Sequence, residues 1–586
     1  MNYLKNNKLL AVSFSVLMIA AIWVRTYQHN DWLYFKMDQA RDTFMVGNAV
    51  KNGPEHLPLL GPRAGATDVS AGFLRLGPIF YYFQYAAGAI FNSTEPEVFA
   101  YPDLFFSILT IPLLYLFLRL YFEKRNSFLV TSMYAFSFLV IQYSRFAWNP
   151  NSLLFFTLLS FYGLLKMLKA DSFKQQAAWA VVWALGTAIG SQLHFLGLFC
   201  LLIISGLVLF THFQLWHPKG IRRAMETFSF KKTLWLSGAF LAVFLLIYSP
   251  VIISDVMRKG ENTKNFIQAF STKPNKKSLS TKISRSFDKQ IKHYCLITTA
   301  ECYKGKTKDN AEFGLLTALI MLSGLLLTAR QLKNEKDGAR KDFLRLLAAW
   351  FGIFFLLAIP LYSSLRPRFF ISVFPIPFIF LGLVFQFLDE KFSSKGKYAA
   401  LIITAAIIGL NIKGTAAWFK EQADSQNKNI SIDRTLILKN QDGVTLGQLE
   451  KAADFIYEKK ITGANIHFYV KPEHVQPIRY LLFQKNDPDL KYFPLKDQND
   501  PNGQYFAVFP AEKNLKFLED KFKGKLKVID SKELGQIKVQ EVEFLESSKK
   551  EDFRFNEDKG ATDRVFWKDV FNTKNDSGAI EIDAAE

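Results

Sequence analysis

The run Tyr34-Phe35-Lys36-Met37-Asp38-Gln39-Ala40-Arg41-Asp42 follows the first long apolar segment of the chain. Asp38, Arg41 and Asp42 have helical spacing, so two carboxylates and one guanidinium can share a helix face. Taken alone, such a cluster is equally compatible with a solvated helix beside a membrane. The rest of the chain decides between these interpretations.

Apolar residues make up 50% of the 586 residues, and 58 of the residues are phenylalanine. They form runs of roughly 17 to 25 residues, the length that crosses a bilayer. The first run has no small-residue cleavage site, so we interpret it as a retained anchor and not as a signal peptide. We expect eleven spans, at residues 8–25, 97–122, 127–145, 152–168, 176–192, 195–213, 234–253, 313–329, 344–362, 369–388 and 398–413.

The apolar segment 77–91 is ambiguous, because it is short, begins with Gly77-Pro78 and carries three tyrosines. These features suit a helix that lies on the membrane. If this segment does not cross, twenty basic residues fall in the connections on one side, and three fall in the short connections on the other. Positive charge stays in the cytoplasm, which predicts a cytoplasmic N-terminus and an outer C-terminus in a plasma (inner) membrane. The net charge of +20 then needs no nucleic-acid partner.

The predicted fold class is a polytopic all-α membrane domain with a small extracytoplasmic α/β domain. The membrane domain covers 1–413, with outer loops at 26–96 and 254–312; the α/β domain covers 414–548, and 549–586 is a charged tail. The α/β domain is expected to contain helices at 445–459, 475–484 and 514–522, strands at 464–470 and 505–510, and two β runs within 526–544.

Two of the three cysteines, Cys295 and Cys302, lie close together in a predicted outer loop. They could form a disulfide if that loop faces an oxidising compartment, and the sequence leaves this open. Cys200 lies in an apolar run and is expected to be inert packing.

The polar motifs between the spans all fall on the predicted outer side. Each has a plain explanation: a turn at Asn149-Pro150-Asn151, a hydrogen-bonded His194, and membrane-anchoring arginines at 366 and 368. Together they place arginines and a carboxylate beside a bilayer. Arginine binds phosphate through two hydrogen bonds, so this set fits a phosphate-bearing lipid substrate.

The layout of residues 10–415 resembles the GT-C class of membrane glycosyltransferases, and especially the bacterial branch related to protein O-mannosyltransferases (family 39) and the lipid A aminoarabinose transferase (family 83). Members of that branch use a polyprenyl-phosphate-linked sugar as donor. The motifs that carry the resemblance are Asp38-Gln39-Ala40-Arg41, Gly77-Pro78-Ile79-Phe80-Tyr81-Tyr82, Arg145 with Asn151, and Arg368-Phe369-Phe370 with Pro375 and Pro377.

The resemblance implies an inverting glycosyltransferase with Asp38 as the base and with a protein, lipid or wall glycan as acceptor. The residues it assigns to binding the substrate or its lipid phosphate are Arg41, Asp42, Tyr81, Arg145, Asn149, Asn151, His194, Arg366 and Arg368. Gln39 and Asn151 stand where the family has acids, so no metal is predicted; a divalent cation held by Asp38 alone would bind weakly.

Three other functions remain open from the sequence. A flippase or transporter would be expected to show midplane ionisable sites and repeats, which we do not find. A polysaccharide polymerase or ligase would use a lipid-diphosphate donor. A receptor would not need the outer acid and arginine cluster.

Overall fold

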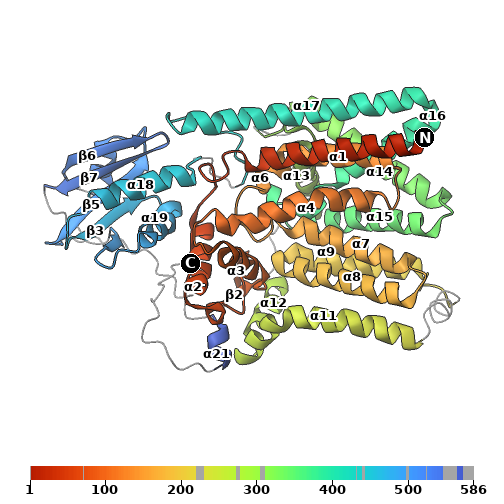
Figure 1. Cartoon of the computed structure of the whole chain (residues 1–586), viewed down its shortest axis with the longest axis horizontal. Coiled ribbons are helices and arrows are strands. Elements are labelled where there is room, and N and C mark those ends of the chain that lie inside the picture. The colour runs from red at the N-terminus through yellow and green to blue at the C-terminus, as the bar shows by residue number, and fades with distance from the viewer. Residues whose placement is uncertain are drawn as a thin grey trace.

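A computed structural model of the chain describes residues 2–69, 72–218, 230–271, 277–303, 310–363, 365–430, 432–437, 443–495, 500–522, 524–545 and 564–571. Long helices run side by side as a bundle, and the strands of a small sheet lie beyond one end of it (Figure 1). The N-terminus is at the other end of the bundle. Arg222 and Arg223, two of the basic residues used to predict topology, and most of the predicted tail lie outside the described residues.

Each predicted span coincides with helix. The helices are α1 (Asn2–Thr26), η2 (Val98–Ala100) with α4 (Tyr101–Leu118), α5 (Lys124–Ala135), α6 (Phe138–Tyr143), α7 (Leu153–Lys169), α8 (Phe173–Leu193), α9 (Phe195–His212), α11 (Phe230–Met257), α14 (Ala311–Asn334), α15 (Gly338–Ala358), η4 (Pro367–Val373) with α16 (Ile376–Phe392), and α17 (Ser394–Ser425). By length and composition, 6 of the described helices can cross a membrane, or 7 if η4 and α16 form one bent span. The expected number of eleven is therefore not confirmed.

The predicted span 127–145 is not one continuous helix, because it breaks between α5 and α6. The break is stabilised by polar partners from other helices. The Phe138 N–H donates to Asn411 Oδ1 at 2.9 Å, and the Ser137 hydroxyl donates to the Ile297 carbonyl at 2.7 Å. A buried backbone group without such a partner would be costly, so these contacts allow the interruption.

The first loop predicted to be outer folds into short elements at one end of the bundle: α2 (Met37–Asn52), η1 (Pro54–His56), the antiparallel pair β1 (Arg63–Val69) and β2 (Gly72–Arg75), and α3 (Ile79–Phe91). With 13 residues, α3 is roughly 20 Å long, whereas a bilayer core is about 30 Å thick. This length agrees with a helix that does not cross. The second large loop forms α12 (Glu261–Ser271) and α13 (Leu279–Thr299).

The C-terminal part forms a five-stranded sheet in the order β4-β3-β5-β7-β6. Its elements are α18 (Leu446–Glu458), β3 (Asn465–Val470), α19 (Pro472–Gln484), β4 (Lys491–Pro494), β5 (Gly503–Pro510), α20 (Leu515–Phe522), β6 (Leu526–Leu534) and β7 (Ile537–Phe544). All the predicted elements are present, including the capping box of Thr445 and Gln448 that begins α18. The sequence did not predict β4, a four-residue edge strand that is too short to show a pattern.

Cys295 and Cys302 form a disulfide in the structure, and both residues are buried. Structural disulfides persist in oxidising compartments. The pair therefore agrees with the predicted outer position of the loop 254–312. Cys200 is a free, buried cysteine.

Because the disulfide occupies two cysteines and the third is buried, single cysteines introduced at the surface will report membrane orientation cleanly. We expect Asn52→Cys, at the exposed end of α2, to react with a membrane-impermeant maleimide in intact cells. Lys336→Cys, between α14 and α15, should react only after the membrane is permeabilised, because basic connections stay inside. If only Lys336→Cys were labelled in intact cells, the orientation of the protein would be opposite to the predicted one.

Candidate active site

The start of α2 is fixed in place by Gln39, the residue that stands where the related family has an acid. Its Oε1 accepts the Lys36 backbone N–H at 3.2 Å, and its Nε2 donates to the Ala147 carbonyl at 3.0 Å. The side chain therefore ties the first turn of α2 to the loop after α6. Asp38 lies in this first turn, where the helix dipole stabilises negative charge.

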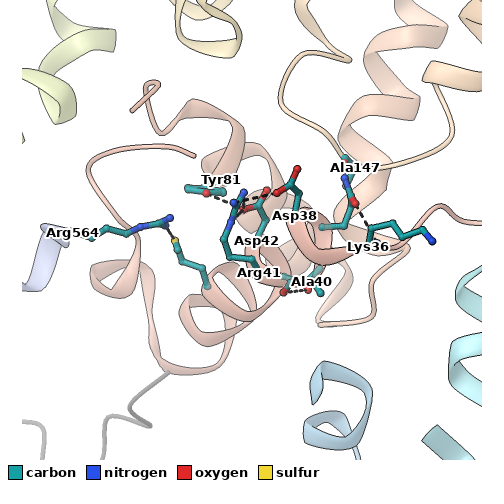
Figure 2. A network of polar contacts seen from close by, with 11 residues as sticks. Lys36, Asp38, Ala40, Arg41, Asp42, Tyr81, Ala147 and Arg564 are labelled. Atoms are coloured by element: carbon teal, nitrogen blue, oxygen red, sulfur yellow. Dashed lines mark hydrogen bonds and ion pairs between the residues drawn. The ribbon is translucent and has the colours of Figure 1, made fainter. Parts of the chain in front are cut away.

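Arg41 joins the two acids of α2, as Figure 2 shows. It donates to Asp42 Oδ1 from Nε at 2.9 Å and from Nη2 at 2.8 Å, and its Nη1 lies 3.4 Å from Asp38 Oδ1. The Tyr81 hydroxyl of α3 also donates to Asp42 Oδ1, at 2.9 Å. The Asp42 side chain is only 3% exposed, whereas that of Asp38 is 51% exposed. Asp42 is therefore a buried structural acid, and Asp38 is the one that a substrate can reach.

Burial by itself lowers the pKa of the Arg41 guanidinium, but the neighbouring Asp42 and Asp38 carboxylates more than offset this effect. The pKa of Arg41 is held above its ordinary value, so the group stays charged. For Tyr81, burial raises the pKa above its usual range. The phenol therefore remains a hydrogen-bond donor to Asp42.

The turn at 145–152 is anchored by Asp103 of α4, a residue to which the sequence analysis gave no role. Its carboxylate accepts the Trp148 backbone N–H at 2.8 Å and the Ser152 hydroxyl at 2.5 Å. The sequence contains one indication of this anchoring role, because Asp103 is a lone acid in an apolar span. Within the turn, Asn149 donates to the Leu193 carbonyl at 2.7 Å, and Asn151 donates to the Phe146 carbonyl at 2.8 Å.

Asn149 and Asn151 thus have structural contacts through their amide nitrogens. The Oδ1 of Asn151 is buried and has no hydrogen-bond partner among the described residues. The Asn151 side-chain carbonyl oxygen is therefore an unused acceptor inside the turn.

Arg366 and Arg368 come from the loop and short helix before α16, and Arg368 lies near both Arg366 and Asp38. The Arg368 guanidinium stacks over the Trp148 ring at 5.3 Å and interacts electrostatically with both Asp38 and Arg366. Arg366 is half-buried, and its side chain has no hydrogen-bond or ion-pair partner in the part of the chain that the structure describes. These two guanidiniums keep donors available for an anion.

His194 lies beside the same group of residues. Its ring is 5.6 Å from that of Phe369. Burial and, to a smaller extent, the charge of Arg368 lower the pKa of His194, so the ring stays neutral. Its Nδ1 accepts the Leu196 backbone N–H at 3.2 Å and caps α9. The structure therefore brings Asp38, Arg366, Arg368 and His194 together from three separate parts of the chain.

Arg145 differs from the other predicted arginines, because its guanidinium is already occupied. It is buried and donates to four backbone carbonyls at the end of α1, those of Val24, Arg25, Tyr27 and Gln28, at 2.7 to 3.3 Å. The cavity beside it has a volume of about 20 Å³, enough for about one water molecule. This geometry favours a structural role over phosphate binding.

Arg145→Ala should therefore destabilise the protein. Each buried carbonyl that loses its donor costs about 1 to 3 kcal/mol, and four carbonyls lose one, so a total loss of roughly 4 kcal/mol or more is expected. Thermal unfolding of the purified protein in detergent measures this effect, with the half-buried Arg366→Ala as the matched control. If Arg145→Ala kept its Tm but lost donor binding, the phosphate-binding role would be restored.

The residues around Asp38 do not form a suitable metal site. Arg41 contacts both carboxylates of α2, and the Gln39 amide is used at the helix start. In the described residues, no three His, Cys, Asp or Glu side chains converge in a way that could hold a metal ion. Divalent cations prefer several oxygen ligands, which this arrangement does not offer.

The C-terminal domain packs directly on the helix that carries Asp38. Lys36 Nζ lies 3.2 Å from His474 Nε2 of α19, and the rings of Phe44 and Tyr480 are 4.8 Å apart. The Tyr480 hydroxyl also donates to the Thr94 carbonyl at 2.5 Å. These contacts could not be predicted from the sequence, because neither segment carries a local pattern that indicates so distant a partner.

The fold resembles that of known membrane glycosyltransferases. ArnT from Cupriavidus metallidurans in the apo state has a TM-score of 0.51 at 12% identity, over 91% of this chain and 98% of that chain. The same enzyme bound to undecaprenyl phosphate gives 0.50 with the same identity and coverage. The Archaeoglobus fulgidus oligosaccharyltransferase in the apo form gives 0.48 at 13% identity, over 85% of this chain and 69% of that one. No curated protein sequence matches the chain.

The fold is similar to that of membrane glycosyltransferases, and the sequence comparison finds a family model that matches part of this chain. Within it, residues 12–253 match the family described as dolichyl-phosphate-mannose-protein mannosyltransferase. The matched region includes Asp38, Arg41, Asp42, Tyr81, Arg145 and His194.

Proposed function

We propose that the protein transfers a sugar from a polyprenyl-phosphate donor to an acceptor hydroxyl on the outer face of a plasma membrane. The observation that carries this proposal is the grouping of the exposed Asp38 carboxylate with Arg366 and Arg368. The acid can act as a base, and the guanidiniums can bind a phosphate.

In the proposed reaction, Asp38 takes the proton of the acceptor hydroxyl while the acceptor oxygen bonds to the anomeric carbon. The bond from that carbon to the phosphate oxygen breaks, and its electron pair leaves with the lipid phosphate. Attack from the side opposite the leaving group inverts the anomeric centre. The leaving phosphate is a stable anion that needs no acid, and Arg366 and Arg368 offset its charge.

The polyprenyl-phosphate donor is supported by two comparisons. The ArnT structure of similar fold was obtained with undecaprenyl phosphate bound, and the family matched by residues 12–253 is described by a lipid-phosphate-linked mannose. The identity of the sugar and the length of the lipid are left open by both. The orientation is supported by the Cys295–Cys302 disulfide, because such bonds form in oxidising compartments.

We assign selection of the acceptor to the C-terminal domain. Its helix α19 contacts α2 near Asp38, through His474 and Tyr480. A cavity of about 330 Å³ lies at the carboxyl ends of β3 and β5 and is lined partly by Lys471, His474 and Glu512. In sheets with parallel strands, ligands bind at such ends.

A transfer assay tests the proposed function. The purified protein is placed in liposomes and supplied with undecaprenyl-phosphate sugars one at a time. Comparing lipid-linked sugars and glycans in cells with and without the protein identifies which donors and acceptors to supply. We expect one donor to be consumed with release of undecaprenyl phosphate and glycosylation of the acceptor. Movement of a lipid-linked sugar across the bilayer without transfer would indicate a flippase. Consumption of lipid-diphosphate donors only would indicate a polymerase or ligase.

A further inference from the structure

A short segment near the end of the chain, residues 564–571, lies on the first outer loop. Phe566 forms an isolated antiparallel bridge with Pro58. The Leu59 N–H donates to the Val565 carbonyl at 2.8 Å, and the Trp567 N–H donates to the Leu57 carbonyl at 3.1 Å. These backbone bonds dock the segment, which then continues as α21 (Trp567–Phe571). We call residues 564–571 the C-terminal strap.

Two side chains of the strap reach α2 and α3. The Trp567 indole N–H donates to the Tyr82 hydroxyl at 3.0 Å. Arg564 Nη1 lies 2.6 Å from Met45 Sδ, and its guanidinium carbon is 5.9 Å from the centre of the Tyr81 ring. Figure 2 shows Arg564 approaching from the side opposite Asp38.

These contacts connect Arg564 to the proposed base. Tyr81, which Arg564 faces, donates to Asp42, and Asp42 is joined through Arg41 to Asp38. Both Asp42 and Arg564 also interact electrostatically with Tyr81. A cation over an aromatic ring is attracted to the ring face, so Arg564 restrains the ring whose hydroxyl holds Asp42. The strap lies outside the region 12–253 that matches the known family.

We propose that the C-terminal strap holds the acid and arginine network of α2 in its catalytic geometry, with Arg564 as a positioning residue that acts through Tyr81. This inference rests on the proposed function, because it assigns Arg564 to the same site. Arg564 touches neither donor nor acceptor in this role. Its effect is therefore on the rate of the reacting complex and not on donor affinity. Small displacements of positioned groups reduce rates strongly.

The test uses the full-length protein with Arg564→Ala and Arg564→Lys. We expect Arg564→Ala to lower kcat about three- to thirty-fold, the range that a lost cation–π contact can produce, with an unchanged KM for the donor. Arg564→Lys keeps a cation over the ring and should restore most of kcat. The matched control is Arg340→Ala, which removes an arginine over Tyr121, 4.7 Å from its ring centre, on a connection predicted to be cytoplasmic.

An unchanged kcat in Arg564→Ala would overturn the proposal, as would a rise in KM that accounts for the whole loss. If Arg564→Ala does not fold, Trp567→Phe replaces it, because this change keeps a ring and removes only the donor to Tyr82. It should lower kcat about two- to five-fold, the effect of losing one hydrogen bond of modest strength. An unchanged kcat in Trp567→Phe would then overturn the proposal.

Hydrogen exchange separates failure of this inference from failure of the proposed function. If the wild-type protein transfers no sugar, the proposed function fails, and exchange of the α2 amides decides the role of the strap alone. We expect the backbone amide hydrogens of α2 to exchange at least ten-fold faster in Arg564→Ala than in wild type, because local opening follows the loss of tertiary contacts. Equal exchange in the two proteins would show that the strap does not hold α2.

Discussion

Asp38→Asn is expected to reduce sugar transfer by roughly 10²- to 10⁴-fold, the usual contribution of a general base, while the protein remains folded. The substitution keeps the shape of the side chain and removes its negative charge and basicity. Because the Asp38 side chain is 51% exposed and its contact with Arg41 is long, at 3.4 Å, its loss should have little effect on stability. Transfer by the purified variant and its Tm are measured together.

Two substitutions make the result specific to Asp38. Asp31→Asn changes another exposed acid of the same outer loop and should leave transfer near the wild-type rate. Asp42→Asn alters the buried partner of Arg41 and should mainly lower stability, by about 3 to 5 kcal/mol, since it leaves a buried charge poorly paired. Near-normal transfer by Asp38→Asn would remove the proposed mechanism, and loss of folding in that variant would indicate a structural role.

The helical membrane part could be predicted from the sequence because each span must satisfy its own backbone hydrogen bonds in lipid. Side chains that face lipid must also be apolar, so each span appears in the sequence as a long apolar run. No local pattern in the sequence indicates the break between α5 and α6. The break depends on Asn411, whose Oδ1 accepts the Phe138 N–H across a sequence separation of 273 residues.

The candidate site was predictable to the extent that its residues are close in sequence or match a family motif. Asp38, Arg41 and Asp42 share a helix face, so their association follows from spacing. The approach of Arg368 to Asp38 was expected from their shared predicted side of the membrane and from the resemblance, and not from spacing. Arg145 was predicted to belong to the same group on its type alone, and its binding role stays a prediction. Its partners in the structure are backbone carbonyls, which any sequence supplies. Arg564 contacts Met45 across 519 residues, and no sequence pattern indicates this.

Arg368→Ala is expected to lower kcat/KM for the donor by roughly 10²- to 10³-fold, the cost of removing one group that stabilises developing charge. Negative charge grows on the lipid phosphate as its bond to the sugar breaks, so both donor binding and the chemical step should suffer. Arg368→Lys retains the charge but loses the two-pronged hydrogen bonding, and its activity should be intermediate. Initial rates at varied donor concentration give kcat and KM separately.

Arg330→Ala is the matched control for Arg368→Ala. Arg330 also lies over a phenylalanine ring, that of Phe387 at 5.6 Å, but on a connection predicted to be cytoplasmic. It should not change donor kinetics. Unchanged kinetics in Arg368→Ala as well would leave membrane anchoring as the role of that arginine.

The double substitution of Arg366 and Arg368 by alanine shows whether both arginines bind one phosphate. If they share this partner, the effects of the two single substitutions on kcat/KM are not additive, whereas independent anchors give additive effects.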